Sequence, residues 1–329
     1  MSFFAVLLAL LAEQLKPLPR DNRVHDALVA WVAWTGRNFD AGKPRHTAVV
    51  WGVSVGVPVL VVLGIYWAIA WWSLLLALLF NVVVLYLTLG FRQFSHYYTD
   101  IRDALDRGDE TEARRLLGEW QHLDASELPR TELLRHVIEH SLLAAHRHVF
   151  GVFFCFVVFS ALGLGPAGAV LYRMAEFSSR YWSYRLRTLD MPANDRLKVL
   201  ARRMFALIDH VPARLTAFGF AVAGNFEEAV GSWRRDAGLW LHPNEGIILA
   251  AAAGAVGVQL GGHAPPGVTP DRSRPFSAGG DSASAEAQGA TAGLAPVGGH
   301  LQSVVGLVWR SVVVWMVLLA LLSLANVVG

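Results

Sequence analysis

Residues 47–89 read TAVVWGVSVGVPVLVVLGIYWAIAWWSLLLALLFNVVVLYLTL, and this stretch contains no charged side chain. A helix needs about 20 apolar residues to cross the roughly 30 Å hydrocarbon core of a bilayer. The stretch therefore predicts two spans, Thr47–Ala70 and Trp71–Leu89, joined with almost no loop into a helical hairpin. Tryptophans lie at the joint, where an aromatic belt is expected: Trp67, Trp71 and Trp72.

The composition of the whole chain agrees with a polytopic membrane protein. Of the 329 residues, 54% are hydrophobic and 16% are charged, whereas soluble domains carry about 25% charged residues. The net charge of +2 and the scattered basic residues do not fit a nucleic-acid partner. The single cysteine, Cys155, excludes an internal disulfide and a C-x-x-C motif. The partner that the composition predicts is the lipid bilayer.

Apolar length and charge divide the chain into segments. We expect interfacial or amphipathic helices over residues 1–46, the transmembrane hairpin over 47–90, cytoplasmic helices over 91–148, a membrane-associated core over 149–262, a disordered linker over 263–300 and a transmembrane helix over 301–329. Arginine and lysine flank the hairpin on both sides, so the positive-inside rule puts its outer ends in the cytoplasm. The linker is rich in proline, glycine, serine and alanine and cannot bury enough apolar surface to become ordered.

The apolar segment Val149–Tyr172 is long enough to span once, but Gly163–Gly168 interrupts it with the sequence Gly-Leu-Gly-Pro-Ala-Gly. Proline within a helix ends or kinks it. Residues 173–203 hold eight basic side chains and three acidic ones, which favours the cytoplasmic side. We therefore predict a re-entrant hairpin that turns at Gly163–Gly168, and a single kinked span is the alternative.

Candidate site residues are ionisable or amide side chains in apolar surroundings. Asp209 and Arg214 are costly in an apolar helix unless they are paired, so they form either part of a ligand site or a structural ion pair. Asn225, Asn244 and Glu245 are expected to supply hydrogen bonds to the same ligand, although Asn244 also suits a helix cap.

A second group of candidates lies in the basic segment that follows the predicted turn. Arg173, Arg180 and Tyr184 are expected to meet an anionic ligand or a lipid headgroup. Arginine and tyrosine together are also typical of an anchor at the membrane interface, and both interpretations stay open.

No motif identifies a catalytic residue. No P-loop, G-x-S-x-G elbow, H-E-x-x-H or G-x-G-x-x-G motif stands in the structural context that its chemistry needs. His140, His146 and His148 lie close together but lack a partner carboxylate for zinc, so we expect them to be cations at the membrane boundary. The sequence predicts no metal and no bound cofactor.

Several stretches within residues 90–262 resemble the CobD/CbiB family. They are Arg173, DHVPARLT at Asp209–Thr216, PNEG at Pro243–Gly246 and AGAVGVQLGG at Ala253–Gly262. The resemblance implies synthesis of adenosylcobinamide phosphate, in which an aminopropanol phosphate is joined to adenosylcobyric acid during cobalamin synthesis. The layout of the opening residues and of the last span resembles AmpE, a membrane protein of the same superfamily that is associated with β-lactamase induction.

The chain departs from the family at an acidic cluster, E-N-T-x-x-D-G. Counted from Arg135 and Glu139, which match, the cluster falls on residues 143–148, where no carboxylate stands. Forming an amide from an unreactive acid needs an activating nucleotide and Mg²⁺ held by carboxylates. We therefore expect an AmpE-like, non-catalytic protein that senses or signals in the envelope and binds a small anionic ligand or another envelope protein. The alternative is a divergent adenosylcobinamide-phosphate synthase that uses ATP and magnesium.

These observations predict an all-α fold. We expect a polytopic helical protein of the bacterial inner membrane, with several passes, a re-entrant hairpin and a cytoplasmic helical region.

Overall fold

The computed structural model describes residues 2–15, 23–39, 44–121, 124–188, 195–262 and 289–328. Regular structure in these residues is helical apart from two isolated β-bridges, so the predicted all-α class is confirmed. The chain forms two compact units. Unit 1 comprises residues 1–92 and 147–209, and unit 2 comprises residues 93–146 and 210–329.

Unit 1 contains both strongly apolar helices and helices that carry several basic side chains. They are α1 (Ser2–Leu15), α2 (Arg23–Phe39), α3 (Pro44–Trp72), α4 (Leu74–Thr88), α8 (Gly151–Ala161), α9 (Ala167–Thr188) and α10 (Asp195–Ile208). The short helix α1 packs on α4 and α8 and buries Ala5, Val6 and Ala9. These contacts bury one face of α1 within unit 1, and the interfacial location expected for residues 1–46 stays a prediction.

The helices α3 and α4 form the hairpin that residues 47–89 predict. Ser73 separates them and caps α4, because its hydroxyl accepts a hydrogen bond from the Leu76 amide at 3.4 Å. Trp71 and Trp72 at the joint are 89% and 87% exposed, as expected for side chains that face a membrane interface.

Three helices are long and apolar enough to cross a membrane, namely His46–Trp72, Arg130–Ala161 and Gly298–Ala325. The first and the last agree with the predicted spans. The predicted span Trp71–Leu89 is not among them, because α4 has only 15 residues. The middle helix was expected to be partly cytoplasmic, and 78% of its apolar window is buried, against 17% and 33% in the other two. Its apolar side chains therefore largely meet protein.

The segment after residue 149 folds back on itself. Helices α8 and α9 pack against each other, and the turn between them uses Gly163 and Gly165 at φ values of +76° and +55°. A Cβ at Gly168 would collide with the Cys155 carbonyl oxygen, so this glycine permits the close approach of the two helices. The predicted helical hairpin is present, and its re-entrant placement in a membrane stays a prediction.

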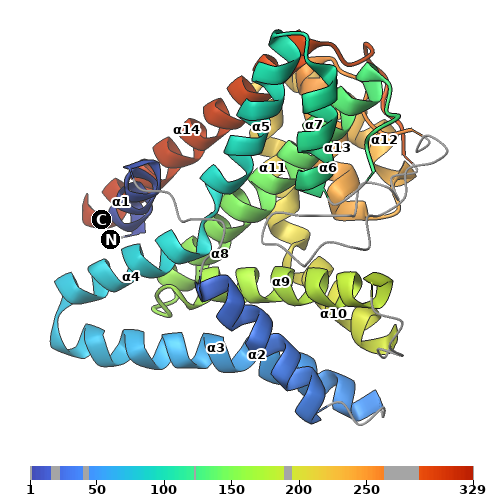
Figure 1. Cartoon of the computed structure of the whole chain (residues 1–329). Coiled ribbons are helices and arrows are strands. Elements are labelled where there is room, and N and C mark those ends of the chain that lie inside the picture. The colour runs from blue at the N-terminus through green and yellow to red at the C-terminus, as the bar shows by residue number, and fades with distance from the viewer. Residues whose placement is uncertain are drawn as a thin grey trace. The chain divides into compact units, whose positions relative to one another are not determined.

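Unit 2 contains the remaining helices. They are α5 (Phe91–Asp106), which begins at the unit boundary, α6 (Glu110–Gln121), α7 (Arg130–Ala145), α11 (His210–Ala223), α12 (Phe226–Asp236), the 3₁₀ turn η2 (Ala237–Leu239), α13 (Pro243–Val256) and α14 (Gly298–Val328). A π-helical turn, η1 (His146–Phe150), joins α7 to α8. Within unit 2, α13 packs against α7, α11, α12 and α14, and Figure 1 shows α7, α11 and α13 side by side.

The helices expected over residues 91–148 are present as α5, α6 and α7, and their cytoplasmic location stays a prediction. The last part of the predicted disordered linker, residues 263–300, differs from the prediction. Residues 263–288 lie outside the described residues, but residues 289–294 form β-bridges with the loop after α13, Val258 with Leu294 and Gly261 with Ala290. Backbone hydrogen bonds therefore order this part, although its composition predicts none.

Candidate functional site

Helix α7 brings polar side chains into the interior of unit 2. Pro129 stands at its N-cap and Glu132 in its first turn, both of which favour a helix start. Beyond the first turn, buried polar side chains alternate with leucine, valine and isoleucine: His136, Glu139, His140 and Ser141. Buried charges are costly unless they are paired or hydrogen-bonded, so each of these side chains calls for a partner.

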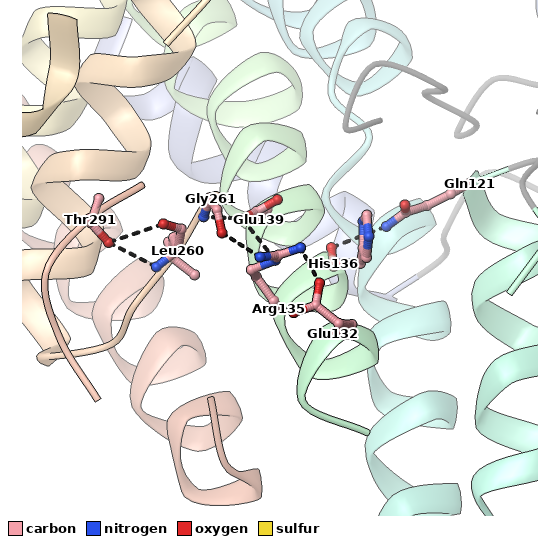
Figure 2. Close-up of polar contacts among 8 residues, drawn as sticks. All are labelled: Gln121, Glu132, Arg135, His136, Glu139, Leu260, Gly261 and Thr291. Atoms are coloured by element: carbon pink, nitrogen blue, oxygen red, sulfur yellow. Dashed lines mark hydrogen bonds and ion pairs between the residues drawn. The ribbon is translucent and has the colours of Figure 1, made fainter. Parts of the chain in front are cut away.

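Glu139 and Arg135 meet the glycine-rich loop at residues 257–262 (Figure 2). The Glu139 carboxylate is 2% exposed and accepts a hydrogen bond from the Gly261 amide at 2.6 Å. The Arg135 guanidinium donates to the Gly261 carbonyl and to the Glu132 carboxylate, and lies 3.9 Å from Glu139. We call Glu132, Arg135, Glu139 and Gly261 the α7 cluster.

The glycine-rich loop has the backbone geometry that this contact requires. Helix α13 starts with Pro243 in its first turn and ends at Gly257, whose φ of +72° gives a left-handed C-cap. Gly261 and Gly262 follow with φ values of +77° and +110°, a region that disfavours residues with a Cβ. Both peptide groups of Gly261 can then face α7, which explains why glycine stands there.

The other end of α7 contacts helix α11. His146 lies 2.9 Å from the Thr216 hydroxyl, measured from Nδ1 to Oγ1, and both side chains are buried. Thr216 ends the stretch Asp209–Thr216. The helix α7 therefore fixes two stretches that are far apart in the sequence, one through His146 and the other through Arg135 and Glu139.

On α11 and α13, two predicted site residues come together. The Arg214 guanidinium donates to the His210 carbonyl at 2.7 Å and to the Asn244 side-chain oxygen at 3.4 Å. Asn244 is not the helix cap that was the alternative for it, since His242 occupies the N-cap position of α13. Glu245 is half-buried in the same first turn.

Asn225 has a local structural role. It is the N-cap of α12, where its side chain accepts from the Glu228 amide at 3.3 Å, and it is exposed. The structure does not bring Asn225 into contact with Arg214 or Asn244 among the hydrogen bonds of the described residues.

Unit 1 contains a separate group of buried charges. The Tyr172 hydroxyl donates to the Asp209 carboxylate at 2.7 Å, and both side chains are buried. Further along α9, Arg173 and Arg180 contact the two oxygens of the buried Glu176 at 2.9 and 3.1 Å. Tyr184 is half-buried one turn beyond Arg180.

The predicted partner of Asp209 stays a prediction. Asp209 ends unit 1, while Arg214 belongs to unit 2. Within its own unit, Asp209 accepts a hydrogen bond from Tyr172, and Arg214 donates to His210 and Asn244.

The expectation that the histidines are cations at a membrane boundary needs correction. His140, His146 and His148 are 4%, 1% and 6% exposed, so they cannot extend toward water as a snorkelling side chain does. The His140 ring packs edge-on against Trp120 with ring centres 4.4 Å apart. The reason is packing: α7 buries nearly all of its side chains beyond the first turn, and His146 and His148 lie in the buried π-helical turn η1 that follows it.

Sequence reasoning missed the α7 cluster as a site. Arg135 and Glu139 were noted only as matching positions, since α7 was expected to be an amphipathic cytoplasmic helix. The signal was present in the sequence, because an arginine and a glutamate at i and i+4 within a mostly apolar helix imply a buried pair. Gly261 could not be joined to that pair without the fold.

The chemistry open to the α7 cluster is recognition of an anion. A guanidinium has five N–H donors in a planar fork, and Arg135 directs them toward one carbonyl and two carboxylates. The Arg135 side chain is 11% exposed. Guanidinium groups bind phosphate and carboxylate groups where their donors can be reached.

Comparison with known proteins assigns these stretches to one family. The family model described as CobD/Cbib protein matches residues 3–265. A cobalamin biosynthesis protein CobD from Stutzerimonas stutzeri is 33% identical over 243 residues, which cover 73% of this chain and 71% of that protein. A protein of the same name from Chromobacterium violaceum is 35% identical over 203 residues, 60% of this chain and 61% of that protein.

More distant relatives have the same name. A cobalamin biosynthesis protein CobD from Mycobacterium tuberculosis is 32% identical over 168 residues, 49% of this chain and 50% of that protein. No solved structure matches the chain.

Proposed function

Because the chain belongs to the CobD/CbiB family, we propose that it is a membrane-bound synthase of cobalamin biosynthesis. In this proposal it forms the amide between adenosylcobyric acid and an aminopropanol phosphate, which was the alternative drawn from the sequence. The observation that carries the proposal is the role of α7, whose Arg135, Glu139 and His146 contact two of the resembling stretches in one unit.

The expected AmpE-like, non-catalytic role in envelope signalling is wrong. The relatives that match are named for cobalamin biosynthesis, and the family model covers residues 3–265. The expectation gave too much weight to the missing acidic cluster at residues 143–148. Those positions contribute to the packed interior of unit 2 through Leu143, Ala144 and Ala145, so their side chains respond to packing as well as to chemistry.

The proposed amide formation needs a site that binds anionic substrates close together. A carboxylic acid does not react with an amine until its oxygen becomes a better leaving group, and ATP supplies that activation as a co-substrate. Both ATP and the aminopropanol phosphate carry phosphate groups, which fits the predicted small anionic ligand. In the proposal, the Arg135 guanidinium binds a phosphate, and Glu139 and Glu132 fix the orientation of that guanidinium.

The α7 cluster does not fit a magnesium ion of its own. Glu132 and Glu139 both lie against the Arg135 guanidinium, and Glu139 also accepts the Gly261 amide. A divalent cation prefers carboxylates whose oxygens are open to it, and an adjacent guanidinium repels it. We therefore assign no step to a magnesium ion held by these residues.

Complementation tests the proposed function. The chain is expressed in a strain that lacks the synthase, and growth that depends on cobalamin made from cobyric acid is scored. We expect the wild-type chain to restore growth and Glu139→Gln to lower ATP-dependent amide formation by the purified protein about a hundredfold, because the carboxyl group that accepts from Gly261 and lies beside Arg135 is lost. Glu119→Gln, on α6 and paired with Arg115, is the control that keeps activity.

Two results would count against the proposal in different ways. Absence of growth, with the chain shown to be present in the membrane, rejects the synthase function. Growth and turnover that are unchanged in Glu139→Gln keep the synthase function but remove the α7 cluster from its site.

We also propose that the protein lies in the bacterial inner membrane with several passes, and its apolar helices support that location.

A further inference from the structure

The segment 289–294, which we call the strap, lies beyond residues 3–265 that match the family. It crosses the glycine-rich loop at residues 257–262 through the two β-bridges. Within the strap, Thr291 is 3% exposed while its neighbours Ala290 and Ala292 are exposed. Thr291 is thus the side chain through which the strap enters the interior of unit 2.

The strap forms hydrogen bonds with the backbone of the residues on both sides of Gly261. The Leu260 amide donates to the Thr291 hydroxyl at 2.8 Å, and the Leu260 carbonyl accepts from the Thr291 amide at 2.8 Å. The Gly262 amide donates to the Gly289 carbonyl at 2.6 Å. Figure 2 shows Thr291 and Leu260 on one side of Gly261 and the α7 residues on the other.

The peptide groups of Gly261 are left to helix α7. The Gly261 amide donates to Glu139 and its carbonyl accepts from Arg135. Two consecutive glycines in the left-handed region give the loop little intrinsic preference for one orientation. The hydrogen bonds between the strap and the two neighbours of Gly261 therefore help to fix the orientation of the Gly261 peptide before Glu139 and Arg135 bind it.

The strap is itself anchored to unit 2. The Asp236 carboxylate accepts hydrogen bonds from the Ala292 amide, from the Ser232 hydroxyl at 2.9 Å and from Arg235 at 2.8 Å. A side chain at Gly289 would collide with the Trp240 ring, so the strap lies directly on that tryptophan. These contacts hold Thr291 opposite Leu260.

We propose that the strap presents the Gly261 peptide to Arg135 and Glu139, and that Thr291 is a positioning residue for amide formation at the α7 cluster. Thr291 acts through Leu260 and does not touch substrate. The role in the reaction rests on the proposed function, while the ordering of the loop is a property of the fold alone.

Substitution of Thr291 tests both parts in the full-length purified protein. Amide hydrogen exchange of the peptide that contains residues 257–262 is followed together with kcat and KM for amide formation. In Thr291→Val, which keeps the side-chain shape and removes the hydroxyl, we expect exchange about tenfold faster, since buried hydrogen bonds are lost. We also expect a fall in kcat of about tenfold with a smaller change in KM, and recovery of both in Thr291→Ser.

A control and three outcomes decide the proposal. Thr88→Val removes a buried hydroxyl from α4, where it bonds only to helix carbonyls, and should leave exchange at residues 257–262 unchanged. Unchanged exchange in Thr291→Val overturns the proposal. Faster exchange with unchanged kcat overturns the positioning role. If the wild-type protein forms no amide, the proposed function fails, and exchange still decides whether the strap orders the loop.

Discussion

Asp236 shows how one residue links packing to pH. Burial alone would raise the pKa of its carboxyl group, but the hydrogen bonds from Arg235, Ser232 and Ala292 outweigh burial and hold the pKa below its usual value. An unperturbed aspartate has a pKa of about 3.9. Because the pKa is lower in the folded state than in the unfolded state, the charged carboxylate stabilises the fold at pH values above the unfolded pKa. This stabilisation is lost as the pH falls through the folded pKa.

Asp236→Asn is therefore expected to lower the free energy of unfolding by about 1–2 kcal/mol at pH 7, because hydrogen bonds to a charged group are replaced by weaker ones. The difference from the wild-type protein should stay constant down to about pH 5 and shrink below about pH 4. Thermal unfolding in detergent at a series of pH values measures it.

Asp106→Asn is the matched control for this experiment. Asp106 is exposed at the end of α5, and surface changes of this kind usually stay within about 0.5 kcal/mol. A difference between Asp236→Asn and wild type that grows as the pH falls from 5 to 3 would contradict the assigned direction.

At the scale of elements, the α8–α9 hairpin depends on the close approach at Gly168. We expect Gly168→Ala to disrupt this packing, because its Cβ would meet the Cys155 backbone carbonyl, which cannot move aside as a flexible side chain does. Overpacking of this kind costs about 1–3 kcal/mol or more. The yield of folded protein and its melting temperature in detergent measure the effect.

The control is Gly52→Ala in α3, where a Cβ would meet nothing within 4 Å. Alanine favours a helix over glycine by about 1 kcal/mol in water, so this variant should be at least as stable as the wild-type protein. If Gly168→Ala folded and melted like Gly52→Ala, the helices α8 and α9 would not be packed as described.

The sequence was informative where local rules apply over many residues. The α3–α4 hairpin and the turn at Gly163–Gly168 follow from apolar length and from the glycines that interrupt it. The failures came where tertiary packing decides. The span predicted over Trp71–Leu89 contains a helix, α4, of only 15 residues, and the burial of α7 was not predicted because charged ends hid its packed centre.

The candidate site was predicted less well than the fold. Arg214 and Asn244 were both predicted as ligand-binding residues, because each stands in a stretch that resembles the family. The structure shows a hydrogen bond between them. Glu139 and Gly261 are 122 residues apart in the chain, and no local sequence pattern predicts their contact. Thr291 lies in a segment whose composition predicts disorder, so only the fold identifies its role.

At the scale of the whole molecule, the orientation in the membrane is the main expectation left to test. The positive-inside rule predicts that the α3–α4 joint faces the periplasm and that the α5 end faces the cytoplasm. In a Cys155→Ala background, Trp72→Cys should be labelled by a membrane-impermeant maleimide in intact spheroplasts, and Arg107→Cys only after permeabilisation. Both positions are exposed in the protein, so access depends on the membrane.

Labelling of Arg107→Cys in intact spheroplasts, with Trp72→Cys protected, would reverse the orientation. Labelling of both would show that the hairpin does not separate the two sides. A lysate treated with detergent, in which both cysteines react, is the control for intrinsic reactivity.

The short helix α4 has a consequence for the bilayer around the protein. Its 15 residues extend over about 22 Å at 1.5 Å per residue, whereas an average hydrocarbon core is about 30 Å thick. If α4 crosses the bilayer as the sequence predicts, lipid beside it must thin to cover its apolar side chains, at a cost of a fraction of a kcal/mol per ångström of hydrophobic mismatch. A hairpin that spans the membrane in this way would favour thinner regions of the bilayer.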